Sequence, residues 1–352
     1  MKIKRLHLCG NTKRYMKRTI IFGIFIHFFV AVLFAIPSQN IRYYFKTLDI
    51  KDGLSQNTVN AILQDKQGFM WFGTKDGLNR FDGLTFRIYN KENSKLGNNF
   101  ITSLHEDGEG NIWVGTDAGV YIYNPYTETF TSFTKLDNIG NRLTRAITWM
   151  DSDSNGDVWI SVDYQGLFRY DIQSDKLINC LNGIIHKPKL NNVTRFWFEN
   201  NRCWVSLYDD DLYYSDDHFE TINSFKDLDG NQPFKGDIIN TQIPNTNNCR
   251  YIGSSNGLTE INMTTGRVRR LLNYYVRDLC FKSQRELWVG TEQGLYIYDL
   301  DKGEINHLLA SDENDVYALA DNAIYSIYRE IYSLLVYEWD FYTGPHINRF
   351  CL

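Results

Sequence analysis

A ten-residue pattern with a central tryptophan recurs along the chain, and this repeat limits the possible folds more than any other feature. Its clearest copies are DKQGFMWFGT (65–74), DGEGNIWVGT (107–116) and KSQRELWVGT (282–291), with weaker copies at 153–162, 198–207 and 245–254. The six central aromatic residues are spaced 42, 46, 45, 47 and 37 residues apart: Trp71, Trp113, Trp159, Trp204, Tyr251 and Trp288. A period of this length is typical of one four-stranded propeller blade.

A second apolar segment follows each central aromatic, as in AGVYIYN (118–124) and QGLYIYD (293–299). Alternating apolar and polar residues indicate a strand, and the glycine before them supplies the positive φ that a tight hairpin needs. Further strands are expected on both sides, with inner strands such as 59–64, 101–105 and 146–150 and outer strands such as 86–89 and 130–133. Each unit therefore has four antiparallel strands.

The sequence predicts an all-β fold, a seven-bladed β-propeller over residues 39–329, with six recognisable blades and an incomplete seventh. Segment 324–328 matches an inner strand, and segment 41–48 resembles an outer strand that is free to complete the last blade. After Arg329 the expected pattern stops. Residues 330–352 are therefore interpreted as an aberrant tail, read in a wrong frame or left by an interrupted gene, and a genuine divergent closing segment is the alternative.

The repeated tryptophan is expected to pack against the neighbouring blade. An exposed tryptophan platform for a sugar ring is the alternative. A binding site is local, whereas a packing device recurs in every repeat, so the recurrence favours packing.

The N-terminal segment 1–38 is interpreted as an export signal or a membrane anchor. It contains seven Lys and Arg and no acidic residue, and residues 19–36 form an 18-residue apolar run. The remainder of the chain is then periplasmic, with the membrane touched only through 19–36 if the signal is not cleaved. This remainder has 30 basic and 42 acidic residues, and so acidic a body argues against binding nucleic acid.

The pattern D-x-x-G-x-x-W-x-G-T followed by x-x-G-[LV] resembles the two-component regulator propeller repeat. Residues 43–90 are similar to the opening of the extracytoplasmic sensors of hybrid two-component systems in Bacteroides-type bacteria. The resemblance implies a glycan-sensing propeller with an oligosaccharide ligand, and it leaves a homodimer open. Relatives continue into kinase, receiver and DNA-binding domains, for which this sequence has no motif. We therefore expect no enzymatic activity of its own.

Propellers also host enzymes and scaffolds, so fold alone leaves function open. One alternative is a secreted propeller enzyme that acts on polysaccharide as a lyase or glycosidase. Another is a non-functional gene fragment whose blades do not close.

The best metal candidate is the loop 151–157 (DSDSNGD), which resembles the first half of a calcium loop. Its twelfth position is Val162, where such a loop has glutamate, and the segment coincides with a turn that recurs in each repeat. We expect no metal site. Four acidic residues that follow the central strands are likewise expected to serve turns and not catalysis: Asp76, Asp117, Asp163 and Glu292.

No other pattern predicts chemistry. The histidines at positions 105, 186, 218 and 307 have no metal or catalytic spacing, and the six cysteines form no zinc pattern. Cys203 and Cys249 are expected to be small apolar filler. We predict no cofactor and no catalytic residue. The ligand contacts stay unknown, and the longest departures from the repeat, 183–192 and 226–248, are candidate specificity loops.

Overall fold

The computed structural model describes eleven stretches of the chain: residues 43, 45–181, 191–199, 201–216, 219–246, 248–312, 314–315, 317–319, 322–329, 333–340 and 344–351. Its elements belong to one compact unit, Tyr44–Leu352, which is separate from Met1–Tyr43. The predicted signal or anchor, 1–38, lies outside the described residues. Within the stretches above, no helix has the length and apolar character needed to cross a membrane.

The chain forms seven antiparallel sheets of four strands each. The first strands of the sheets are β2 (Val59–Gln64), β6 (Ile101–Glu106), β10 (Ile147–Ser152), β14 (Val193–Glu199), β18 (Ile239–Pro244), β22 (Val276–Phe281) and β26 (Ile324–Arg329). The second strands are β3 (Met70–Thr74), β7 (Ile112–Thr116), β11 (Val158–Val162), β15 (Arg202–Leu207), β19 (Cys249–Ser254), β23 (Glu286–Thr291) and β27 (Ser333–Asp340).

The third strands are β4 (Gly77–Phe81), β8 (Gly119–Asn124), β12 (Gly166–Asp171), β16 (Leu212–Ser215), β20 (Gly257–Asn262), β24 (Gly294–Asp299) and β28 (Gly344–Cys351). The fourth strands are β5 (Phe86–Tyr89), β9 (Thr129–Ser132), β13 (Lys176–Asn179), β17 (Asn223–Ser224), β21 (Val268–Leu272), β25 (Glu304–Leu309) and β1 (Phe45–Leu48). A 3-10 turn, η1 (Ile50–Asp52), follows β1.

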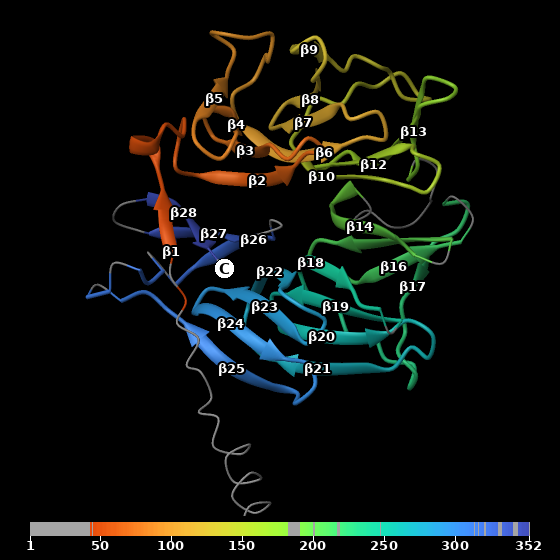
Figure 1. Cartoon of the computed structure of the whole chain (residues 1–352). Coiled ribbons are helices and arrows are strands. Elements are labelled where there is room, and N and C mark those ends of the chain that lie inside the picture. The colour runs from red at the N-terminus through yellow and green to blue at the C-terminus, as the bar shows by residue number, and fades with distance from the viewer. Residues whose placement is uncertain are drawn as a thin grey trace, which may run out of the picture. The chain divides into compact units, whose positions relative to one another are not determined.

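Six of the sheets correspond to the six sequence repeats, so the all-β propeller and its six repeat blades are confirmed. We number these blades one to six in chain order, from β2–β5 to β22–β25. Each first strand contacts the first strand of the next sheet, and the series closes where β26 contacts β2. Figure 1 shows these first strands around a central space, with the fourth strands at the rim.

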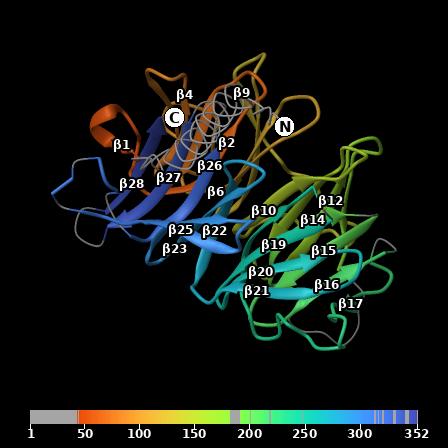
Figure 2. The same ribbon diagram turned by 60° about the horizontal axis from the view of Figure 1, so that its bottom comes forward.

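The closing sheet has the order β1-β28-β27-β26, so it joins the two ends of this unit. Figures 1 and 2 both show β1 beside β28. Phe45 is the register partner of Phe350, and Leu48 that of Ile347. The expected outer strand in 41–48 is therefore present as β1. The predicted incompleteness of a seventh blade is not confirmed, since this sheet has four strands. The reading of 330–352 as an out-of-frame tail concerns the gene and stays a prediction.

The core lies between neighbouring blades and not within one. In the first interface, Trp71 and Leu78 of blade one pack with Ile101, Val114 and Tyr123 of blade two. The same arrangement recurs with Trp113, Trp159, Trp204 and Tyr251, each of which packs on the following blade. These aromatic side chains are nearly fully buried, so the packing interpretation of the repeated tryptophan is confirmed for them.

The aspartate at the first position of the repeat accepts hydrogen bonds from the backbone of its own turn and from the indole of the tryptophan. In blade one, Oδ1 of Asp65 accepts hydrogen bonds from the N–H groups of Gln67 and Phe69, and Oδ2 accepts one from Nε1 of Trp71 at 2.7 Å. Asp107 and Asp153 make the same three contacts in blades two and three. The spacing of six residues therefore has a physical cause, because it brings the carboxylate to the indole.

The glycine after the tryptophan makes room for the next blade. A Cβ on Gly73 would lie 2.5 Å from Cγ2 of Ile101, and a Cβ on Gly115 would lie 2.7 Å from Cβ of Ile147. Both isoleucines begin the first strand of the following blade. A side chain at these glycines would therefore force neighbouring blades apart.

Candidate ligand-binding channel

Each of the seven first strands has a register shift after its first residue. In β2, Val59 pairs with Thr74 and Ala61 pairs with Gly73, so Asn60 is the extra, bulged residue. The shift recurs at the same position of every other first strand. A bulge leaves one residue unpaired and redirects the strand locally.

Three bulged residues bind the next blade. Nδ2 of Asn60 donates to the carbonyl of Ile101 at 2.8 Å, and Nδ2 of Asn240 does the same to Val276 at 2.8 Å. Oγ1 of Thr148 lies 3.1 Å from the carbonyl oxygen of Val193. These hydrogen bonds help to set the distance between the first strands of neighbouring blades at the position of the bulge.

The residue after each bulge lines a central cavity of about 420 Å³, to which all seven first strands contribute. We call this cavity the channel. We call these seven residues the inner ring: Ala61, Ser103, Trp149, Arg195, Thr241, Asp278 and Ser326. Its small or polar members contrast with the apolar residues between blades, and only two members are charged. The inner ring is therefore the part of the propeller best suited to bind a ligand.

Asp278 is the buried acid of the inner ring. Oδ1 accepts hydrogen bonds from Thr241 Oγ1 and the Leu279 N–H, each at 2.9 Å, and Oδ2 accepts from Ser326 Oγ at 3.0 Å and the Ile327 N–H at 2.8 Å. Burial raises the pKa of this carboxyl, and the four hydrogen bonds act in the opposite direction. Asp278 therefore ties blades five and six to the closing sheet.

Arg195 is the cation of the inner ring, and its guanidinium lies over the ring of Trp149, 4.7 Å from the centroid. Its Nη1 donates to the carbonyl of Thr194 at 2.8 Å. Burial lowers the pKa of this guanidinium, and the charge of Asp278 raises it. Arg195 and Trp149 come from neighbouring blades, so the stacked pair spans an interface at the channel wall.

Arg277 adds a second cation to the wall, at the bulge of β22. Its guanidinium lies 4.3 Å from the ring centroid of Tyr325, and Nη2 donates to Oε1 of Glu292 at 2.6 Å. Its charge is thus balanced by a carboxylate of its own blade.

His105 and Asp151 line the cavity from β6 and β10. Nε2 of His105 lies 2.7 Å from Oγ of Ser152, and burial lowers the pKa of His105 to about 4. Burial raises the pKa of Asp151, whose Oδ1 accepts from the N–H of Ser152 at 2.8 Å.

The sequence-predicted metal candidate, 151–157, does not gather its carboxylates. Asp151 lines the channel. Asp153 accepts hydrogen bonds from the backbone of its turn and from the indole of Trp159, and Oδ2 of Asp157 lies 3.8 Å from Nε of Arg169. Across the described stretches, no three His, Cys, Asp or Glu side chains are grouped to hold a metal ion. The loop is therefore a repeat turn.

The four acids that follow the central strands lie in the turns between second and third strands. Asp76 and Asp117 accept hydrogen bonds from the side chains of Asn99 and Asn98, which lie in the loop before β6. Glu292 pairs with Arg277, and the Asp163 N–H donates to the carbonyl of Ala146. These contacts agree with the turn interpretation.

The remaining candidates are dispersed. His307 is exposed on β25, and His186 and His218 lie outside the described residues. Cys203 is buried beside Cys180, whose thiol pKa burial raises to about 12, whereas Cys249 is half-buried and accepts from Asn262.

The candidate loop 183–192 falls almost entirely outside the described residues. The other, 226–248, needs a correction, because residues 239–244 form β18, the first strand of blade five. The repeat is weak in this region, because blade five has Tyr251 where most repeats have tryptophan.

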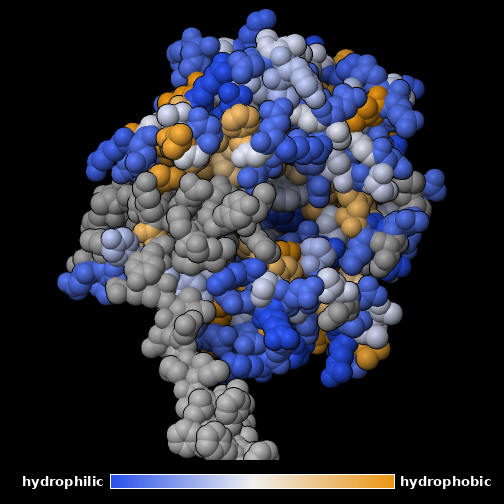
Figure 3. Space-filling view, viewed as in Figure 1, coloured by the Kyte–Doolittle hydropathy of each residue, from blue (hydrophilic) through white to orange (hydrophobic). Residues whose placement is uncertain are grey.

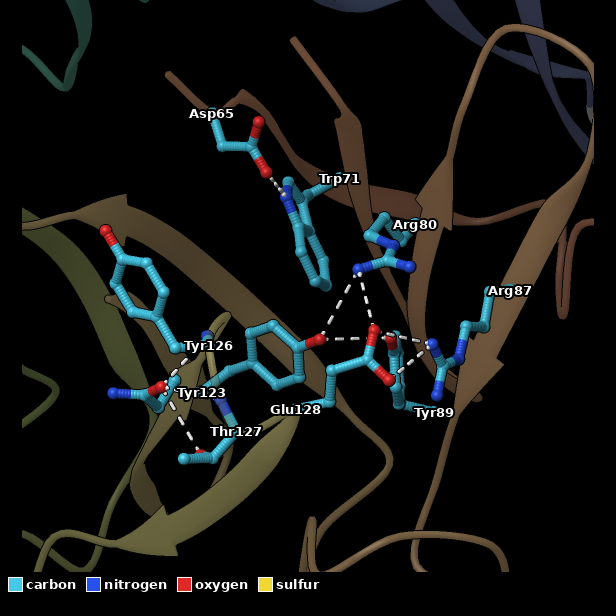
Figure 4. A network of polar contacts seen from close by, with 10 residues as sticks. Asp65, Trp71, Arg80, Arg87, Tyr89, Tyr123, Tyr126, Thr127 and Glu128 are labelled. Carbon is cyan, nitrogen blue, oxygen red and sulfur yellow. Dashed lines mark hydrogen bonds and ion pairs between the residues drawn. The ribbon is translucent and has the colours of Figure 1, made fainter. Parts of the chain in front are cut away.

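Two larger hollows, of about 520 and 540 Å³, lie between neighbouring blades. The first lies between the fourth strands of blades one and two, and the second lies beside turns of blades three and four. Beside the first, both carboxylate oxygens of Glu128 accept hydrogen bonds of 2.9 Å from Nη1 of Arg87, and Oε1 lies 3.6 Å from Nη1 of Arg80. The hydroxyls of Tyr89 and Tyr123 are 3.2 Å apart (Figure 4). The network links blades one and two.

Beside the second hollow, Arg202 pairs with Asp216 and Asp153 holds its turn. The charged groups of both networks are thus satisfied within the protein. On the face shown in Figure 3, hydrophilic residues predominate and apolar ones form small separate groups. The channel therefore remains the candidate site.

Comparison with known proteins supports the fold and the repeat. A model of the two component regulator propeller family matches residues 53–76 and 95–118, so the chain carries repeats of this family. Histidine kinase P4 of Formosa agariphila is 44% identical over 81 residues, which are 22% of this chain and 6% of that protein.

Among solved structures, the extracellular domain of a putative hybrid two-component system from B. thetaiotaomicron is similar with a TM-score of 0.73 and 24% identity, over 88% of this chain and 42% of that one. Virginiamycin B lyase from Staphylococcus aureus is similar with a TM-score of 0.65 and 12% identity, over 88% of this chain and 100% of that one. The chain spans less than half of the first two of these relatives.

Proposed function

We propose that this chain is an extracytoplasmic ligand-sensing propeller of a hybrid two-component signalling system. The family repeats and the fold shared with the extracellular domain of such a system support this assignment. The observation that carries it is the central cavity of about 420 Å³, which the inner ring lines and to which the first strands of all seven sheets contribute. Clefts of this size with a few converging polar groups are typical of small-molecule sites.

The proposed ligand is a glycan fragment. Amide and hydroxyl groups such as those of Asn60, Ser103 and Thr241 can exchange hydrogen bonds with sugar hydroxyls, and the channel also has the aromatic walls of Trp149 and Tyr325. The ligand would bridge several blades at once, so binding would bias their relative positions.

The proposal includes export through residues 1–38, with the propeller on the periplasmic side and the membrane contacted only through 19–36. A homodimer is part of the same proposal. Analytical ultracentrifugation of the detergent-solubilised full chain tests this part independently of ligand binding.

The experiment is a thermal-shift and calorimetric screen of the full chain against plant, algal and host oligosaccharides, with each mixture afterwards analysed by mass spectrometry. A sensor binds without forming product. A ligand at a hundred times its Kd should stabilise the fold by about 2.7 kcal/mol. Binding accompanied by cleavage would contradict the sensor proposal and favour the alternative, a secreted lyase or glycosidase. The similar fold of a known lyase is consistent with that class of function.

The third reading, a non-functional gene fragment, predicts a ring that does not close. Such a protein would unfold without a cooperative transition, because open sheet edges and an apolar blade face would be exposed. A single sharp transition in calorimetry contradicts it.

A further inference from the structure

Arg195 has a partly buried positive charge that forms no ion pair among the described residues, although the carboxylate of Asp278 acts on it from across the inner ring. Within the described stretches its guanidinium makes one hydrogen bond, to the carbonyl of Thr194, and one stacking contact, with Trp149, and it forms no ion pair. An uncompensated buried charge is costly, so such a group is usually paired or bound to a ligand.

The other charged groups of the channel have polar partners within the protein. The carboxylate of Asp278 accepts four hydrogen bonds, and Arg277 is paired with Glu292. Asp151 accepts from the backbone of Ser152. Of the two arginines that line the channel, Arg195 is therefore the one without an ion pair among the described residues.

Three residues of the channel wall also contain buried polar atoms that have no protein partner: Oγ1 of Thr102, Nε1 of Trp149 and Nε of Arg277. Two of these atoms can only donate a hydrogen bond, and the third can donate. Donors therefore predominate among the buried, unpartnered polar atoms of the wall, beside a cation without an ion pair. Anionic oxygens would satisfy both deficits.

We propose that the channel binds a small oxyanion, a carboxylate or a sulfate ester carried by a sugar, with Arg195 as its charged contact. This inference rests on the proposed function and names the chemical class of its ligand. A guanidinium presents two parallel N–H donors to such a group, which a lysine ammonium does not match. Trp149 holds the guanidinium in place from the neighbouring blade.

The test compares four probes at equal ionic strength with the full chain: D-glucuronate, D-glucose 6-sulfate, inorganic sulfate and D-glucose. The variants are Arg195→Met, which keeps the length of the side chain against Trp149, Arg195→Lys, and the control Arg270→Gln at an exposed site on β21. Binding is followed by calorimetry and by the shift in Tm. We expect glucuronate or glucose 6-sulfate to raise the Tm of the wild type and of R270Q, and D-glucose to leave it unchanged.

In Arg195→Met the affinity for the anion should fall at least tenfold, and Arg195→Lys should recover only part of it. The ligand-free Arg195→Met protein should be as stable as the wild type, because the change removes a partly buried charge that has no ion pair and keeps the packing against Trp149. A large fall in its Tm without ligand would assign Arg195 a structural role and overturn the inference. The affinities for glucuronate and for glucose 6-sulfate show whether the site prefers a carboxylate or a sulfate ester. Binding of inorganic sulfate without binding of either sugar would contradict a group carried by a sugar.

Equal responses to all four probes, or none from any anion, overturn the inference. The proposed function fails separately, when no oligosaccharide of the screen binds. If a neutral oligosaccharide stabilises the wild type and Arg195→Met equally, the proposed sensor function stands and the proposed anion site at Arg195 is wrong.

Discussion

The indole Nε1 of Trp71 donates a hydrogen bond of 2.7 Å to Oδ2 of Asp65, six residues earlier in the chain (Figure 4). The other carboxylate oxygen closes the turn that contains Asp65. One aspartate therefore fixes the turn between two strands and the orientation of the main packing residue between two blades.

Replacing Asp65 by Ala should destabilise the fold by about 2 to 3 kcal/mol, because a buried indole N–H loses its acceptor and two backbone N–H groups lose theirs. Urea unfolding of the full chain measures the difference. Asp229→Ala, at an exposed turn position, is the control and should change stability by less than about 0.5 kcal/mol. Equal effects of the two changes would contradict the role of Asp65.

Replacing Gly73 by Ala should cost about 2 kcal/mol or more, because the new Cβ would lie 2.5 Å from Cγ2 of the buried Ile101. Gly108 has open space within 4 Å of a Cβ, so Gly108→Ala is the matched control and should be nearly neutral. Chemical unfolding compares the two variants. A neutral Gly73→Ala would mean that the spacing of blades one and two adapts.

The blade architecture could be predicted because its signals are local and repeated. Trp71 and Gly73 recur at one spacing, and the residues that specify a blade lie within about fifty positions. The closing sheet was harder. In its register Tyr337 occupies the place that Gly73 and Gly290 hold elsewhere, so the sequence pattern ends before the strands do.

The channel could not be predicted, because the residues that line it differ from blade to blade. Ala61, Trp149, Arg195 and Asp278 hold equivalent positions and share no residue type. Their equivalence depends on the bulge that precedes them, which leaves no composition signal. In each first strand the inner-ring residue comes two positions after the apolar residue that begins the strand, so an alignment on that apolar residue places the ring residues at one position.

Glu199 and Arg250 form a buried ion pair between blades four and five, with Oε2 and Nε 2.9 Å apart and side chains 17% and 5% exposed. Glu199→Gln should destabilise the protein by about 3 kcal/mol, because it leaves the charge of Arg250 buried without a counter-ion.

The exposed pair of Arg202 and Asp216 provides the control for Glu199→Gln. Asp216→Asn should cost less than about 1 kcal/mol. Equilibrium unfolding in urea measures both, and a Glu199→Gln protein as stable as Asp216→Asn would show that the buried pair adds nothing.

Stability should fall as the pH is lowered from about 6.5 toward 4, in part because of His105. Burial depresses the pKa of His105 to about 4, so in this window the unfolded chain binds a proton that the folded chain does not. Urea midpoints at pH 7.5 and 5.0 measure the change, and His105→Gln should reduce it.

The raised pKa values of Asp151 and Asp278 act in the opposite direction, because protonation relieves the cost of burying these carboxylates. The difference between the wild type and His105→Gln therefore isolates the histidine. An unchanged profile in His105→Gln would exclude this histidine as the cause.

The closing sheet has a mechanical consequence. Phe45 and Phe350 are register partners in adjacent antiparallel strands, so a force that pulls the two ends of this unit apart acts first on a single residue pair. The four pairs of β1 and β28 would then separate one after another, as in peeling, whereas strands loaded in shear resist together. The ring is thus weakest against tension applied through its own termini, and it would open there while the six repeat blades stay folded.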